Sequence, residues 1–182
     1  MCSSDLNRPE DRIPLYETRV AILDTVLSAQ EQSAEATRQF NAGKNAWQAE
    51  RFADATDSFQ AAKDEFSAAR SLIARSRGRT DEFDGHPRME TIDLDGVRGH
   101  LDRIYDRMEL AVSFTSSMRQ AARAGRDGDR ERANGHLREA NADIRSFNAI
   151  DPPTVRDIAV ALGLIRGTAR DGTVIDIDGE AV

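Results

Sequence analysis

The chain has 182 residues, of which 39% are hydrophobic, 31% charged and 5% aromatic, and its formal net charge is −7. The length suits one ordinary domain. The negative charge argues against a protein that binds nucleic acid. No apolar run approaches the roughly 20 residues of a membrane span, so we expect a soluble protein without a transmembrane segment.

Arginine replaces lysine almost throughout the chain. Lys44 and Lys63 are the only lysines among 25 basic residues, and Asp outnumbers Glu among the 32 acidic ones. This acidic composition resembles that of haloarchaeal proteins and favours a halophilic, archaeal source. The alternative is a GC-rich genome, in which codons for Arg, Ala, Gly and Asp are frequent whatever the salt concentration.

Cys2 is the only cysteine, so neither an internal disulfide nor a cysteine-based metal site is expected. The opening residues MCSSD have neither the charged nor the apolar region of a signal peptide. This favours a cytoplasmic protein. In the alternative, Met1 was added for expression, and Cys2 is the first residue of a lipoprotein anchored at the outer membrane face.

The first predicted helix begins near Pro14, after a flexible segment 1–12, because proline is tolerated in the first turn of a helix. Apolar residues then recur at three- and four-residue steps in two neighbouring stripes, which predict one wide apolar face. One stripe contains Tyr16, Val20, Leu23, Leu27 and Ala34, and the other contains Leu15, Ile22, Val26, Ala29, Ala36 and Phe40.

A second helical stripe starts at Phe52 and closes with Leu72 and Ile73. The turn between the two helices is expected near residues 48–51. No Gly or Pro marks that turn, so one unbroken helix is the alternative. Residues 74–95 contain Gly78, Gly85 and Pro87 and are predicted to form a long loop.

Three further helices follow. The third spans Val97 to Ala121 and ends at Gly125 and Gly128, and the fourth begins near Asp129. Asp95 or Asp129 is expected to cap a helix N-terminus. The domain of two hairpins therefore covers 13–150. A short C-terminal helix covers 151–168, and 169–182 form an acidic tail.

Two segments of the chain resemble each other at a constant offset of 78 residues. The four pairs are Ala55 and Ala133, Phe59 and Leu137, Ala62 and Ala140, and Phe66 and Ile144. A duplicated helical hairpin would produce this pattern. Together with the stripes, it predicts an all-α fold of antiparallel helical hairpins, packed as a bundle or as a short stack.

The first copy also resembles the tetratricopeptide repeat, in which two antiparallel helices pack through small and aromatic residues. Gly43, Phe52, Ala55, Phe59 and Ala62 fall at that family's spacing. In the second copy, Gly128 and Asp129 resemble the turn between the helices. However, Ala121 replaces the glycine and Arg130 replaces the aromatic. The helices are also longer than the family's, and the terminal proline is missing.

The resemblance implies a binding module that presents side chains of its first helix to a partner. The matching positions are Thr37, Phe40, Lys44 and Trp47. A basic side chain beside an exposed aromatic would suit a peptide carboxylate or an apolar anchor. The alternative is that Phe40 and Trp47 belong to the core and that Lys44 is solvated.

The sequence contains no recognisable catalytic motif, so we expect no enzymatic activity and no cofactor. His86, His100 and His136 form no metal-binding pattern. The strings Asp93-Leu-Asp95-Gly96 and Asp176-Ile-Asp178-Gly179 lack the closing Glu of a calcium loop. The basic cluster of Arg70, Arg75, Arg77 and Arg79 is attributed to a helix C-terminus, where cations suit the helix dipole, rather than to a phosphate site.

Two functions remain after these exclusions. The first is an adaptor or scaffold that binds a peptide or a partner helix. The second is a structural, envelope-associated protein that self-assembles and is anchored through Cys2. The identity of the protein partner and the oligomeric state are left open.

Overall fold

The computed structural model describes residues 12–83 and 92–165, and the described part is helical apart from turns and short connecting segments. The all-α prediction is therefore confirmed. The predicted acidic tail, His86, and the predicted N-terminal segment except for Arg12 lie outside the described residues. The helices are α1 (Arg12–Gln48), α2 (Phe52–Thr80), η2 (Asp81–Phe83), α3 (Leu94–Arg126), α4 (Arg130–Ala149) and α5 (Val155–Ala161).

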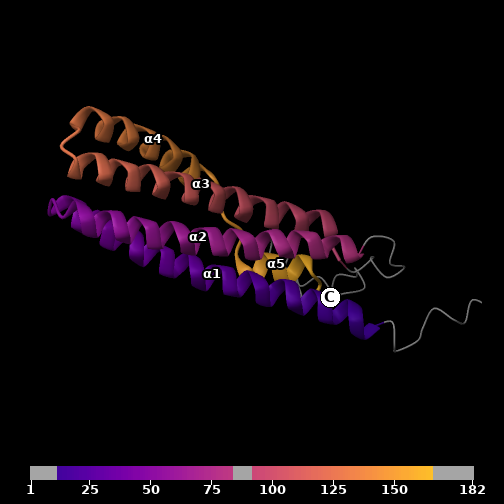
Figure 1. The fold of residues 1–182 in the computed structure, drawn as a ribbon. Coiled ribbons are helices and arrows are strands. Elements are labelled where there is room, and N and C mark those ends of the chain that lie inside the picture. The colour runs from indigo at the N-terminus through magenta and orange to yellow at the C-terminus, as the bar shows by residue number, and fades with distance from the viewer. Residues whose placement is uncertain (1–11, 84–91, 166–182) are drawn as a thin grey trace, which may run out of the picture.

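The four long helices lie side by side in chain order, with α1 and α4 at the two edges of an elongated stack (Figure 1). Each packs mainly against its neighbours in sequence, so α1 with α2 and α3 with α4 form two hairpins. Their two tight turns lie at the same end of the molecule (Figure 1). The short helix α5 returns to contact α1 and α3.

The two tight turns share one hydrogen-bond pattern. At the first turn, Arg51 N–H donates to the Ala46 carbonyl at 2.9 Å, and at the second, Asp129 N–H donates to the Ala124 carbonyl at 2.9 Å. In each case the preceding residue has positive φ, which is 57° at Glu50 and 78° at Gly128. Both turns are Schellman-type C-terminal caps. Equivalent residues are 78 positions apart, the offset that relates the two sequence segments.

The first turn contains no glycine, because Glu50 occupies the left-handed position that Gly128 occupies in the second turn. A residue with a Cβ pays roughly 1 kcal/mol there relative to glycine. We expect Glu50→Gly to raise the free energy of unfolding by about that amount, which corresponds to a Tm increase of about 2–4 °C in thermal unfolding. Gly128→Ala is the matched control and should lower it. A neutral or destabilising Glu50→Gly would contradict the assignment.

The predicted loop from residue 74 is wrong at its start, because α2 continues to Thr80. Ser76 and Thr80 are buried, and Arg77 Nε lies 2.8 Å from Asp102 Oδ1 of α3. The Arg77 guanidinium also lies 4.7 Å from the Tyr105 ring centroid. These contacts hold the last turns of α2 against α3, so Gly78 sits inside the helix.

Aspartates begin two of the helices. Asp129 Oδ1 accepts a hydrogen bond from Arg132 N–H at 3.0 Å at the start of α4, as predicted. At the start of α3 the cap is Asp93 rather than Asp95, since Asp93 Oδ1 accepts from Gly96 N–H at 2.9 Å. An N-terminal carboxylate satisfies a backbone donor that the helix leaves unpaired.

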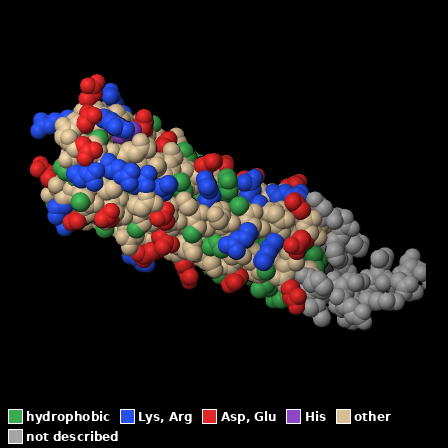
Figure 2. Space-filling view, viewed as in Figure 1, with side chains coloured by type: hydrophobic (Ala, Val, Ile, Leu, Met, Phe, Trp, Pro, Cys, Tyr) green, Lys and Arg blue, Asp and Glu red, His purple; other side chains and the backbone are tan. Residues whose placement is uncertain are grey.

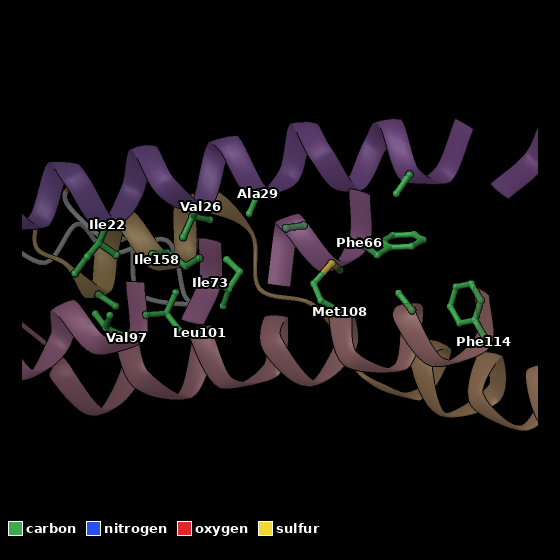
Figure 3. Close-up of a cluster of buried hydrophobic side chains, with 14 of the residues drawn as sticks. Ile22, Val26, Ala29, Phe66, Ile73, Val97, Leu101, Met108, Phe114 and Ile158 are labelled. Atoms are coloured by element: carbon green, nitrogen blue, oxygen red, sulfur yellow. The ribbon is translucent and has the colours of Figure 1, made fainter. Parts of the chain in front are cut away.

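The core runs along the contacts between α1, α2 and α3 (Figure 3). In one half of the molecule, Ile158 of α5 lies between Val26 of α1 and Leu101 of α3. In the other half, where no α5 intervenes, aromatic rings fill the space between the helices. Gly43 lets α1 approach α2 closely, because a Cβ there would lie 2.7 Å from the buried Phe59 ring.

Helix α5 begins with a capping box. Asp157 N–H donates to Thr154 Oγ1 at 3.1 Å, and Thr154 N–H donates to Asp157 Oδ2 at 2.7 Å. The backbone and side-chain hydrogen bonds from Thr154 lower the pKa of Asp157 below its ordinary value of 3.8. A carboxylate whose pKa is lowered in the folded state stabilises that state above its unfolded pKa and loses this contribution as the pH falls.

We therefore expect hydrogen-exchange protection of α5 to decrease as the pH falls below about 4, the ordinary pKa range of an Asp carboxyl. Asp157→Asn should weaken α5 slightly at neutral pH and remove most of this pH dependence. Exchange measured by mass spectrometry at several pH values, corrected for the intrinsic rate, checks both outcomes. Equal acid sensitivity in the variant would assign the effect to other carboxyl groups.

Candidate functional site

The four predicted site residues divide into two exposed and two packed side chains. Thr37 and Lys44 are exposed on α1. The Phe40 ring lies 5.5 Å from Phe59 and 5.2 Å from Phe114, measured between ring centroids. The Trp47 ring lies 5.3 Å from Phe52, edge to face. Phe40 and Trp47 are thus partly buried and pack against the core, as in the alternative interpretation, while Lys44 is exposed.

One of the two α1 stripes is buried and the other is not. Leu15, Ile22, Val26, Ala29 and Ala36 are buried in the core, which confirms the second stripe. In the first stripe, Tyr16 is 61% exposed, Val20 40% and Leu27 43%. Leu23 is partly buried and Ala34 is exposed. Packing therefore divides the predicted wide apolar face, and only its second stripe enters the core. We call Tyr16, Val20, Leu23, Leu27 and Ala34 the outer stripe.

The position of α1 at the edge of the stack explains this exposure. A helix covered on one side buries only the residues that face its neighbours, and α1 packs mainly on α2 and α5. Hydrophobic side chains reach the surface along the N-terminal half of α1, at the lower right edge of the molecule in Figure 2. Three of the four exposed large hydrophobic residues of the described chain lie in the outer stripe.

The opposite edge of the stack has a different surface. The solvent-facing side of α4 carries polar and charged residues such as Arg130, Asn134, Arg138 and Asn141. No large hydrophobic side chain of α4 is classed as exposed within the part of the chain described by the structure. A terminal helix of a stack usually has such a polar outer face. The apolar outer face of α1 is thus not a general property of this fold's edges.

A row of acidic residues borders the outer stripe. Glu17, Asp24 and Glu31 are all exposed and recur every seven residues, so they follow one side of α1. Glu17 and Asp24 directly follow Tyr16 and Leu23 of the outer stripe, and Glu31 lies seven residues further along. The three- and four-residue spacing of the stripe continues beyond Ala34 to Thr37 and Lys44, so these two predicted site residues extend the same face with polar side chains. This acidic row was not predicted from the sequence, although the seven-residue spacing of its three members could have indicated it.

A cavity of about 180 Å³ lies between α1 and α3 beside the α4–α5 linker. Its lining is mostly apolar, and Arg107 provides the cationic group. Arg107 Nη1 donates to the Ile150 carbonyl at 2.6 Å, and its guanidinium lies 4.0 Å from the Phe147 ring centroid. Burial lowers the pKa of Arg107. Through these contacts, Arg107 holds the α4–α5 linker against α3.

Two of the histidines have partners on their own helices. His100 Nδ1 lies 2.7 Å from Arg103 Nη2, and burial together with this cation lowers the pKa of His100. His136 Nδ1 lies 3.0 Å from Glu139 Oε2 on the surface of α4. Within residues 12–83 and 92–165, no group of three or more His, Cys, Asp or Glu side chains is placed to hold a metal ion.

None of the helices described here is both long enough and apolar enough to cross a membrane. Comparisons of the chain with protein-family models, with curated proteins and with solved structures find no match.

Proposed function

We propose that this protein is a non-enzymatic interaction module, an adaptor or scaffold, that binds a partner helix along the outer face of α1. The observation that supports the proposal is the outer stripe, since Tyr16, Val20 and Leu27 remain exposed at helical spacing on one face. Contiguous exposed apolar surface is uncommon on monomeric proteins and usually marks a contact with another molecule. Apolar residues three and four positions apart are the pattern by which helices pack on helices.

The test is affinity capture of the tagged chain from its source cells, with Val20→Glu/Leu27→Glu compared with the unmodified chain. Two exposed positions of α4 provide the matched control, Asn134→Glu/Asn141→Glu, which adds the same charge on the polar edge. All three proteins should unfold within a few degrees of one another, because surface substitutions change stability by about 0.5 kcal/mol or less.

A partner retained by the unmodified chain and the control, and lost from Val20→Glu/Leu27→Glu, supports the interaction module. If Val20→Glu/Leu27→Glu retains every co-purified protein as well as the unmodified chain does, the outer stripe is not the surface that binds them. If the chain captures only itself and the stripe variant abolishes that capture, the self-assembling alternative replaces the adaptor.

A further inference from the structure

The acidic row beside the outer stripe has no basic residue at the neighbouring positions of its own helix. The positions three and four residues before and after Glu17, Asp24 and Glu31 contain no Lys or Arg, although such neighbours commonly pair on helices. None of the three forms a hydrogen bond or ion pair with another described residue. By contrast, Glu35 on the same helix pairs with Arg38. Among the described residues, the row therefore presents three carboxylates without a hydrogen-bond or ion-pair partner along an apolar surface.

A second copy of the chain in antiparallel orientation is a poor occupant of this face. A twofold axis that pairs two outer stripes in antiparallel orientation would bring Asp24 close to Asp24 of the other copy and Glu17 close to Glu31. Isologous contacts place identical patches opposite each other, and juxtaposed like charges oppose association. The pairing would therefore bury apolar surface at the cost of repulsion along its whole length.

The C-terminal segment of the same chain is also a poor occupant. Residues 166–182 contain four acidic residues, Asp171, Asp176, Asp178 and Glu180, against two arginines, Arg166 and Arg170. Its apolar residues Val174, Ile175 and Ile177 are interleaved with these acids. Placing them on the outer stripe would bring carboxylates next to the acidic row.

We infer that the partner segment is a basic amphipathic helix, an inference that rests on the function proposed above. Its apolar residues would cover Tyr16, Val20 and Leu27, and Lys or Arg along one flank would meet Glu17, Asp24 and Glu31. The distance from Tyr16 to Ala34 is about 27 Å along a helix, or about five turns. Apolar burial supplies affinity in such a contact, and complementary charge supplies specificity and the rate of association.

The experiment uses the full chain and two synthetic peptides of about 20 residues, a length at which an isolated helix can form. Both peptides carry Leu at three- and four-residue spacing, and one has Lys along a flank where the other has Glu. Binding is measured by fluorescence anisotropy at low and high salt. The tested variant is Glu17→Lys/Asp24→Lys/Glu31→Lys, which reverses the row.

A control variant separates local from overall charge. Asp57→Lys/Asp106→Lys/Glu109→Lys changes the net charge by the same amount, at exposed positions on α2 and α3. We expect the Lys peptide to bind the unmodified chain and the control with similar affinity. Reversing the row should weaken this binding about tenfold or more and confer binding of the Glu peptide. Added salt should reduce the difference between the peptides.

Three results would overturn the inference. Equal losses in the two triple variants would mean that overall charge attracts the peptide. A dimer in sedimentation that Val20→Glu/Leu27→Glu dissociates would assign the face to a second copy. Tighter binding of both peptides by Ile175→Asp/Ile177→Asp would assign it to the C-terminal segment.

The two proposals fail differently. If a cellular partner is lost from Val20→Glu/Leu27→Glu but the peptides show no charge preference, the interaction module stands and the basic helix is wrong. If no partner depends on the outer stripe and neither peptide binds, both are wrong.

Discussion

Replacing Phe114 with alanine is expected to lower the free energy of unfolding by about 3–5 kcal/mol, the usual cost of truncating a buried phenylalanine. Phe114 is 5% exposed. Its ring centroid lies 5.2 Å from that of Phe40, 6.0 Å from Phe66 and 5.5 Å from Phe147. This one side chain therefore contacts rings from α1, α2 and α4, and its loss would loosen the packing of α3 against these three helices together.

Thermal unfolding followed by circular dichroism checks this result. At about 2–4 °C per kcal/mol for a chain of this size, the Tm of Phe114→Ala should fall by roughly 6–20 °C. Tyr16→Ala is the matched control, since it also removes an aromatic ring but from a residue that is 61% exposed. Its Tm should hardly change. A similar decrease in both variants would mean that Phe114 is not the centre of the core.

The helices themselves could be predicted because their signals are local. Three- and four-residue spacing marked all five helices, and Gly128 and Asp129 marked the second turn. Local signals gave wrong predictions where tertiary contacts imposed a different backbone conformation. Gly78 is a helix breaker on propensity, but Ser76 and Thr80 on either side of it are buried and Arg77 pairs with Asp102 of α3. Glu50 lacks the flexibility of glycine, but the hairpin imposes positive φ on it.

The candidate site was less predictable, because exposure depends on the position of a helix in the stack. Both stripes of α1 have the same spacing, and only the packing of α2 and α5 decides that Ile22 is buried and Val20 is exposed. Likewise, Phe40 and Trp47 match a binding surface in spacing, but in the structure they are partly buried and pack against Phe59 and Phe52 of α2. One sequence does not say which of two apolar faces a neighbour will occupy.

The second large expected effect is the release of helix α5 by a substitution at Ile158. Ile158 and Leu162 are fully buried, with Ile158 between α1 and α3 (Figure 3). The Asp93 N–H donates to the Ala161 carbonyl at 2.9 Å. Ile158→Asp would place a carboxylate in the apolar core, and burying such a charge costs more than α5 can gain by packing. The variant should therefore release α5 rather than unfold the stack.

The cost of releasing α5 together with Leu162, which follows it, is limited to the burial of their side chains, about 1.5–3 kcal/mol each for Ile158 and Leu162. Hydrogen exchange followed by mass spectrometry should show protection lost in residues 152–165 and retained in α2. Arg156→Asp, at an exposed position of the same helix, is the control and should keep α5 in place. Loss of protection throughout α2 would contradict this expectation, because α5 would then belong to the cooperative unit that holds α1 and α3 together.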